Sequence, residues 1–140
     1  MPTSLTRTVR FRARHRLHRP DWSDEHNDQV FGALADPAGH EHDYHCVVTV
    51  AAPIDATMGM VIDLAVLDRI LRDEVITPLD GTYINRDVPA FASGRPLPTC
   101  EAIAGHVFQR IAARLPAGVT LERVRVMEDP TLYADCTGIP

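Results

Sequence analysis

Apolar and polar residues alternate along four stretches of this chain, which is the period-two pattern of strands with one buried face. In the most regular stretch, 9–17, apolar side chains and one histidine take one face and four arginines take the other. Alternation returns over 40–50 and 121–128, and 131–136 forms a shorter fourth stretch after a proline. Residues 1–8 carry no such pattern. We therefore predict four strands after a loose N-terminal start.

Two other stretches repeat apolar residues every three or four positions, the spacing of an amphipathic helix. The first, 64–76, follows Asp63 as a candidate N-cap and is stopped by Pro78. The second, about 99–114, begins with Thr99 as its N-cap. The sequence therefore predicts two helices between the second and third strands.

The order of two strands, two helices and two strands predicts an α+β fold, with both helices on one face of a four-stranded antiparallel sheet. The segments 18–39 and 79–98 are polar or broken by proline and glycine, so they predict long loops, the first with room for one helical turn. At 140 residues the chain has the length of one ordinary domain, so we expect 1–140 to fold as a single unit.

Composition narrows the classes of binding partner that the protein is expected to have and the cellular compartment in which we expect it. The formal net charge of −5 argues against nucleic acid as a partner. No apolar run reaches the roughly 18 residues of a membrane span, so no membrane partner is expected. The N-terminal segment is charged and has no apolar stretch of the signal-peptide type. Three cysteines at no disulfide or metal spacing then favour a reducing, cytoplasmic location.

Three histidines suggest a metal site. His40 and His42 are two positions apart in a predicted strand, so both point to the same face. His15 lies on the apolar face of the first strand. Three imidazoles with an open fourth position describe a catalytic zinc site. The pattern leaves simpler interpretations open: a histidine pair of no function, and a core histidine bonded to backbone.

The order of motifs along the chain resembles the 6-pyruvoyl-tetrahydropterin synthase family, which includes 6-carboxy-tetrahydropterin synthase of the queuosine pathway. The resemblance spans roughly residues 9–135. It rests on Phe11-x-Ala13-x-His15-x-Leu17, Gly39-His40-x-His42-x-Tyr44, Gly59-Met60-Val61-x-Asp63, Pro98-Thr99-x-Glu101 and Glu128.

This resemblance implies a T-fold (tunnelling fold), in which subunits assemble into barrels, commonly as homohexamers with active sites between subunits. It also implies that His15, His40 and His42 bind zinc, where the metal would act as a Lewis acid on substrate hydroxyls. The substrate implied is a small pterin, of the 7,8-dihydroneopterin triphosphate type.

The same resemblance assigns substrate contacts. It places Glu128 where the family's glutamate anchors the pterin ring, which a carboxylate can do by accepting two hydrogen bonds. Read without the resemblance, Glu128 is a solvated acid at a strand end. Thr99 and Cys100 are expected near the edge of the pterin.

The proton-transfer residues depart from the family pattern. Leu34 stands where the family has a catalytic cysteine, and Gly81 replaces the histidine that follows Asp80. Asp80 is kept and is the predicted catalytic residue. The function predicted is a zinc-dependent lyase or cyclase, cleaving carbon–oxygen or carbon–carbon bonds with an altered proton relay. The alternatives are a catalytically silent zinc- and pterin-binding paralogue and a structural zinc protein.

Overall fold

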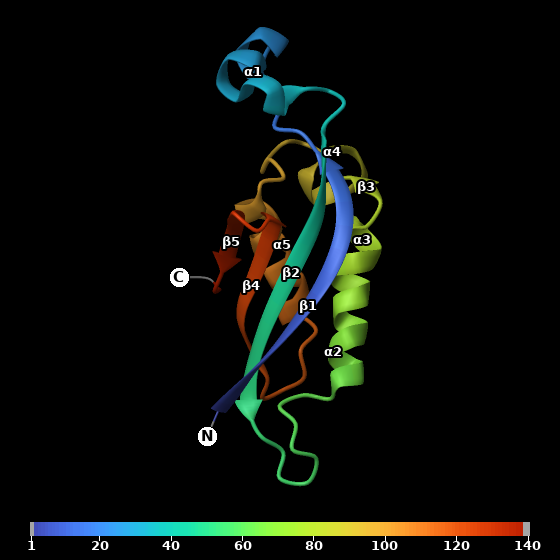
Figure 1. The fold of residues 1–140 in the computed structure, drawn as a ribbon, viewed down its shortest axis with the longest axis vertical. Helices are drawn as coiled ribbons and strands as arrows, with labels where there is room; N and C mark the ends of the chain where they lie inside the picture. Colours follow the sequence, from blue (N-terminus) through green and yellow to red (C-terminus); the bar gives the residue numbers. More distant parts are fainter. Residues whose placement is uncertain (1, 139–140) are drawn as a thin grey trace.

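The computed structural model describes residues 2–138 and is built around one twisted sheet with the strand order β3-β1-β2-β4-β5 (Figure 1). Neighbouring strands are antiparallel, except that the short β3 runs parallel to β1. The strands are β1 Pro2–His15, β2 His40–Pro53, β3 Thr82–Tyr83, β4 Thr120–Asp129 and β5 Leu132–Cys136.

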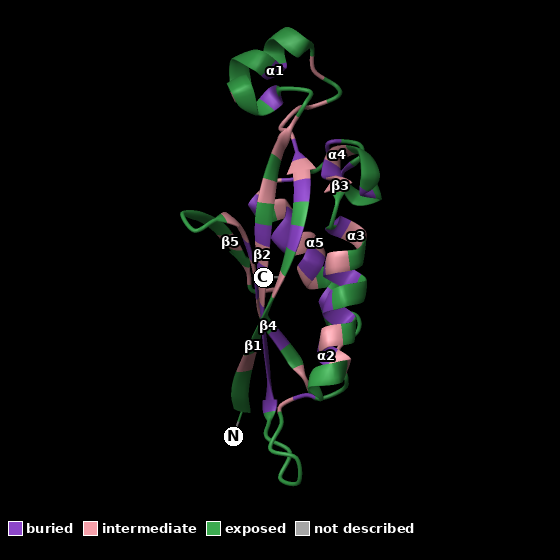
Figure 2. Ribbon diagram, turned by 45° about the vertical axis from the view of Figure 1, so that its right-hand side comes forward, coloured by how far each residue is buried: buried purple, intermediate pink, exposed green. Residues whose placement is uncertain are grey.

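The two main helices cover one face of the sheet, as predicted (Figure 2). α2 spans Leu64–Leu71 and α5 spans Cys100–Ala112. Both start as the sequence predicts, since the side chains of Asp63 and Thr99 accept hydrogen bonds from the first-turn amides. The core lies between these helices and the apolar faces of β1, β2 and β4.

The sheet corrects two expectations. It has five strands instead of four, because the two residues of β3 pair with Ala13 and Arg14, and a strand of two residues is too short to show a periodic pattern. The predicted loose start is wrong, because β1 begins at Pro2 and pairs with β2 along its whole length. The side chains of Pro2–Thr8 are mostly exposed, so their pairing leaves no alternation of apolar residues in the sequence.

Short helical segments fill the two predicted loops. The first contains α1 (Asp24–Phe31) and a 3₁₀ turn (Gly32–Ala35), which lie beyond the end of the sheet (Figure 1). The second contains β3, α4 (Ile84–Asp87) and a 3₁₀ turn (Pro89–Phe91). The only buried side chain in α1 is that of Asn27, so this helix has no apolar stripe by which the sequence could have predicted it.

The helix predicted over 64–76 is continuous but irregular. After α2 it widens into a π-helical turn, Arg72–Ile76, and ends as α3, Thr77–Leu79. Among residues 2–138, none of the helices combines the length and the apolar character that a membrane crossing requires.

Candidate metal centre and ligand pocket

His15 and His42 meet at the end of the sheet where β1 finishes and β2 begins. In the ladder His15 is paired with His40, and His42 is paired with Ala13, so His15 and His42 are diagonal neighbours on one face. Their Nε2 atoms lie 3.2 Å apart, and the side chain of His15 is almost fully buried. Two imidazole nitrogens from different strands therefore point at one place.

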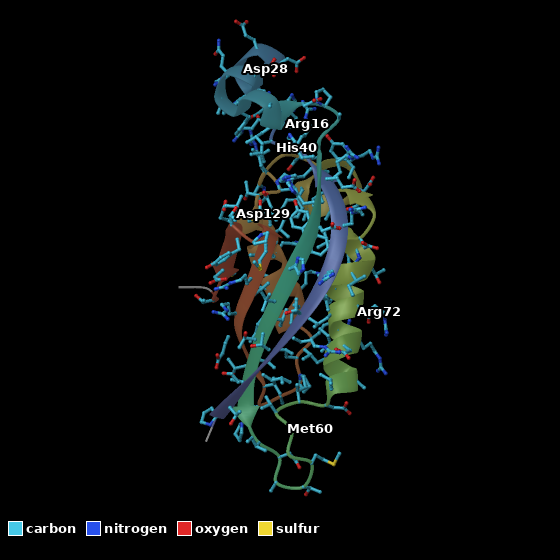
Figure 3. All side chains as sticks on the ribbon, in the orientation of Figure 1. Arg16, Asp28, His40, Met60, Arg72 and Asp129 are labelled. Atoms are coloured by element: carbon cyan, nitrogen blue, oxygen red, sulfur yellow. The ribbon has the colours of Figure 1, made fainter. Side chains whose placement is uncertain are left out.

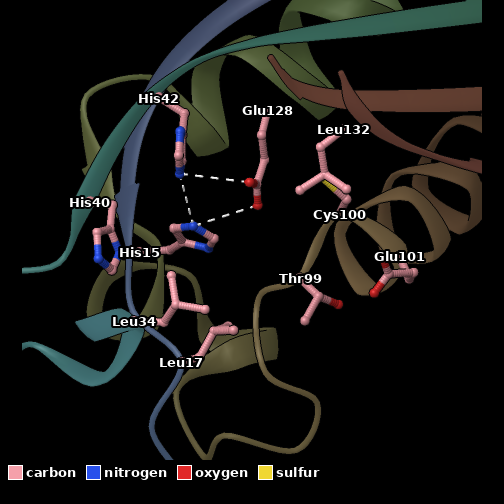
Figure 4. A pocket seen from close by; sticks show the side chains of 10 residues that line it. All are labelled: His15, Leu17, Leu34, His40, His42, Thr99, Cys100, Glu101, Glu128 and Leu132. Carbon is pink, nitrogen blue, oxygen red and sulfur yellow. Dashed lines mark hydrogen bonds and ion pairs between the residues drawn. The ribbon is translucent and has the colours of Figure 1, made fainter. Parts of the chain in front are cut away.

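Glu128, from β4, completes a group of three ligand atoms (Figure 4). Its carboxylate oxygens lie 3.6 Å from Nε2 of His15 and 3.8 Å from Nε2 of His42. Ligands bound tetrahedrally to zinc at about 2.1 Å are roughly 3.4 Å from one another. The two nitrogens are 3.2 Å apart and each lies nearest to a different oxygen of Glu128, so a carboxylate that turns one oxygen toward both nitrogens completes a group that fits a single divalent cation.

A hydrogen bond at Nδ1, the second ring nitrogen of His15, fixes the tautomer of this histidine. Nδ1 lies 2.7 Å from the carbonyl oxygen of Pro98, so Nδ1–H donates there and Nε2 carries the free lone pair. Burial lowers the pKa of His15, against the raising effects of this hydrogen bond and of the charge on Glu128. A neutral imidazole with a fixed orientation is the form that binds a metal.

His40 lies beside this cluster and is not part of it. Figure 3 shows it where β2 begins, between the sheet and α1. Its ring centre is 6.2 Å from that of His15, and its Nε2 lies 3.1 Å from the carbonyl oxygen of Ala33. In the group of three ligand atoms, Glu128 takes the place that the sequence had given to His40, whose role as a ligand stays a prediction.

The cluster forms one wall of a pocket of about 330 Å³. Three leucines, His40 and the start of α5 form the rest of its lining (Figure 4). The lining residues are His15, Leu17, Leu34, His40, His42, Thr99, Cys100, Glu101, Glu128 and Leu132. A mostly apolar cavity with a few converging polar groups is typical of a small-molecule site.

The pocket brings together the predicted contact residues Thr99, Cys100 and Glu128. Burial, with the negative charge of Glu128, raises the pKa of the Cys100 thiol to about 12. At neutral pH this side chain is therefore a neutral thiol and not a nucleophilic thiolate.

Three lining residues had no predicted role in the site. Glu101 belongs to the Pro-Thr-x-Glu motif, and its place in the first turn of a capped helix beside Thr99 was the available signal. Leu17 ends the motif that contains His15, which placed it near the site without giving it a role. Leu132 carried no signal, because an isolated leucine is indistinguishable from any other apolar residue.

Asp80 lies in a different place from the cluster. Its carboxylate accepts a hydrogen bond from the backbone N–H of Arg12 at 2.9 Å, and it lines a second pocket of about 490 Å³ with Glu41 and Tyr83. Within one chain it does not reach the pocket that contains His15. Its catalytic role stays a prediction that requires a second subunit.

A third cavity, of about 400 Å³, touches the other side of the cluster. His42 and Glu128 line both this cavity and the apolar pocket. The remaining lining includes Asp43 and Asp129, so it is far more acidic than the leucine-lined pocket.

Comparison with known proteins identifies the family. The family described as 6-pyruvoyl tetrahydropterin synthase matches residues 4–138. The human 6-pyruvoyl tetrahydrobiopterin synthase is 39% identical over 124 residues, which are 89% of this chain and 83% of the human protein.

Two solved structures show the same architecture. The Caenorhabditis elegans 6-pyruvoyl tetrahydropterin synthase superposes with a TM-score of 0.90 at 28% identity, covering 99% of this chain and 97% of that one. A Plasmodium vivax 6-pyruvoyltetrahydropterin synthase, with a catalytic glutamate changed to cysteine, gives a TM-score of 0.67 at 16% identity and 97% coverage of both chains. The predicted α+β T-fold is thus confirmed, and the chain belongs to the 6-pyruvoyl tetrahydropterin synthase family.

Proposed function

We propose that this chain is a zinc-dependent lyase- or cyclase-type enzyme acting on a pterin, of the 7,8-dihydroneopterin triphosphate type, or on a related substrate. The observation that supports this most directly is the His15–His42 pair, with Nε2 atoms 3.2 Å apart at the wall of the pocket. The hydrogen bond from His15 to Pro98 leaves the metal-binding nitrogen free.

Zinc suits the donors present, because it takes imidazole nitrogen and carboxylate oxygen in four-coordinate sites with one position open to a substrate. His15 and His42 would hold it, with either Glu128 or, once its ring leaves the Ala33 carbonyl, His40 as the third ligand. When bound, zinc polarises substrate hydroxyl groups and lowers their pKa.

Two carboxylates are candidates for the pterin anchor. A pterin ring presents several N–H donors on one edge, which a carboxylate can accept in pairs. Each oxygen of Glu128 faces a histidine, so metal binding competes with its role as anchor. Glu101 lines the same pocket, and its side chain makes no hydrogen bond or ion pair within residues 2–138. We keep Glu128 as the predicted anchor and add Glu101 as the second candidate.

Side chains at the N-terminal end of α5 would orient the edge of the bound pterin. Thr99 uses its hydroxyl oxygen to accept the amide hydrogen of Ala102, so its own hydroxyl hydrogen stays available to a ligand. Cys100 presents a neutral thiol beside it. These small donors, set against the leucine side of the pocket, would fix which way a flat heterocycle lies.

The proton relay is the part of the proposal that departs most from the family. Leu34 lines the pocket at the position where the resemblance places a cysteine, and a leucine exchanges no proton. The catalytic residue changed in the Plasmodium vivax protein is a glutamate, so a protein of this fold can have a catalytic carboxylate. In this chain a pocket carboxylate, or Asp80 supplied by a neighbouring subunit of a homohexamer, would serve.

Leu34 also favours a second candidate function. A chain with the metal cluster and the pocket, but with an apolar side chain at the relay position, could bind zinc and a pterin without turning it over. Such a protein would be a silent paralogue with a sensing or carrier role.

Purified zinc-loaded protein, incubated with 7,8-dihydroneopterin triphosphate, distinguishes these functions. We expect consumption of the pterin with release of inorganic triphosphate, both followed by chromatography, and loss of this activity in His42→Ala. Binding without consumption would support the silent paralogue. Stoichiometric zinc with neither binding nor consumption would leave a structural metal site.

A further inference from the structure

One wall of the leucine-lined pocket belongs to a turn that has little support of its own. Leu34 lies in the 3₁₀ turn Gly32–Ala35, and its side chain lines the pocket (Figure 4). This side chain is still 48% exposed, so packing alone does not fix it. Within Gly32–Ala35 only Ala35 is buried, and the burial of one methyl group contributes little. Because 3₁₀ hydrogen bonds are poorly aligned, a turn this short needs contacts from outside to keep its position.

Two carbonyl groups of this turn are bound by the residues that follow His15. The carbonyl oxygen of Leu34 accepts the backbone N–H of Leu17 at 2.8 Å. The carbonyl oxygen of Ala35 accepts two hydrogen bonds from the guanidinium of Arg16, one of them from Nε at 3.0 Å. The turn is therefore tied directly to the end of β1, next to the metal cluster.

A third carbonyl of the turn is bound by a group that the metal would take away. Nε2 of His40 lies 3.1 Å from the carbonyl oxygen of Ala33, and His40 can bind a cation only after its ring has left that oxygen. The turn then depends on the bonds from Leu17 and Arg16. Of these two, only Arg16 is a charged donor, and charged donors make stronger hydrogen bonds than backbone amides do. Arg16 is therefore the main contact of the turn when the site is ready for a ligand.

Arg16 is itself fixed by the second long loop. Its backbone N–H donates to Oδ1 of Asn85 at 2.9 Å, and Nδ2 of Asn85 donates to the carbonyl oxygen of Arg16 at 3.0 Å. Asn85 lies in α4. Arg16 thus joins three segments that are far apart in the sequence: the end of β1, the turn Gly32–Ala35 and α4.

We propose that Arg16 is a positioning residue of the pocket, whose guanidinium holds the turn Gly32–Ala35 where Leu34 closes the apolar side. Arg16 is half-buried and is not among the residues that line this pocket, so it acts through the turn and not by touching the ligand. The inference rests on the proposed function only for the chemistry of the ligand, a pterin. The hydrogen bonds that carry it are those of the chain alone.

Arg16→Gln tests this, because it removes the guanidinium and shortens the side chain. Since the N–H of Leu17 donates to the turn, its hydrogen exchange, followed by NMR, reports whether the turn stays attached. This exchange should become at least about tenfold faster relative to that of Val48, a buried residue inside β2, as expected for loss of a charged hydrogen bond. The affinity of the zinc-loaded protein for neopterin, measured by fluorescence, should fall about fourfold, the effect of one methylene group of apolar contact.

Arg14→Gln is the matched control. Arg14 donates to the carbonyl oxygen of Ala38, which lies in the same loop but outside the turn. Its loss should change neither the exchange of Leu17 nor the affinity for neopterin. Arg16→Lys keeps a charged donor and should fall between the parent and Arg16→Gln, so it decides the question if Arg16→Gln does not fold.

Exchange of Leu17 that rises no more than exchange of Val48 overturns the inference, because Arg16 would then stabilise the whole fold and not the turn. Faster exchange of Leu17 with unchanged neopterin affinity overturns the link between the turn and the pocket. If the parent protein binds no neopterin, the proposed function fails. The exchange measurement needs no ligand and still decides whether Arg16 holds the turn.

Discussion

His15 contacts His42 across the sheet although the strand register pairs it with His40. The diagonal contact arises because the Nδ1–H of His15 is fixed on Pro98, which directs Nε2 away from its ladder partner. His40 instead bonds to the carbonyl of Ala33. The contribution of each histidine to metal binding can therefore be separated by substitution.

His42→Ala should abolish stoichiometric zinc binding, because it removes one of the two converging nitrogens. His40→Ala should weaken binding less, since its ring must leave Ala33 before it can ligate. His45→Ala is the control, since His45 lies on the opposite face of β2. Metal content after dialysis, measured by mass spectrometry, checks all three. Full zinc occupancy in His42→Ala would contradict the site.

Substitution of the two pocket carboxylates, Glu128 and Glu101, one at a time should distinguish metal binding from pterin binding. Glu128→Gln should weaken zinc binding, because its oxygens are next to both histidines. Glu101→Gln should keep the zinc and weaken pterin binding by about tenfold or more, since a hydrogen bond to a charged group contributes about 1.5–3 kcal/mol. Fluorescence titration with neopterin measures this, and Glu122→Gln, an exposed acid of β4, serves as the control. Wild-type pterin affinity in Glu101→Gln would remove Glu101 as an anchor.

Gly39→Ala should destabilise the fold more than Gly32→Ala. Both glycines have positive φ angles, 71° and 58°, which residues with a Cβ atom rarely adopt, so each alanine adds backbone strain. At Gly39 a Cβ atom would also lie 2.9 Å from the carbonyl oxygen of His15, whereas Gly32 has open space. Denaturant unfolding should show the larger loss in Gly39→Ala, accompanied by weaker zinc binding. Equal losses would show that the chain near His15 moves freely.

Leu34→Cys should raise the rate of triphosphate release from dihydroneopterin triphosphate. It places an acid–base group in the lining of the pocket, and a positioned group of this kind contributes about a hundredfold at the lower end. Leu34→Ala is the control for the extra space alone. If both variants turn over substrate equally, the gain comes from access and not from proton transfer.

His106 should make the fold less stable in mild acid. Burial and the charge of Arg110 lower its pKa from the usual 6.5, against the raising effect of Glu74. Between its lowered pKa and about 6.5 the unfolded chain binds more protons at this group, so the unfolding free energy falls as pH decreases through that range. His106→Gln should reduce this slope, measured by denaturant unfolding at pH 7.5 and 5.5. A slope equal to that of the parent would contradict the prediction. His15, whose pKa is lowered too, should leave a residual slope in the variant.

The fold was predictable where burial leaves a periodic pattern. β2, β4, α2 and α5 were found from alternation, helical spacing and the caps Asp63 and Thr99. β3 was missed, because it is held by its pairing with β1, and α1 was anticipated only as one helical turn, because it is polar on nearly all sides. Pairing and tertiary support of this kind leave no local signal in the sequence.

The candidate site was predictable in its residues and less so in its geometry. Strand alternation brought His15 and His42 to one face and turned Glu41 toward Arg12 and Arg14, away from the cluster. The proximity of Glu128 to both histidines depends on the order of three strands, which a motif does not encode.

His42 and Glu128 face two separate cavities, one lined by leucines and one lined by acids. A ligand that filled the leucine side would therefore cover only one flank of these two residues and leave the flank on the second cavity uncovered, so a second small molecule or water could approach the same pair from behind.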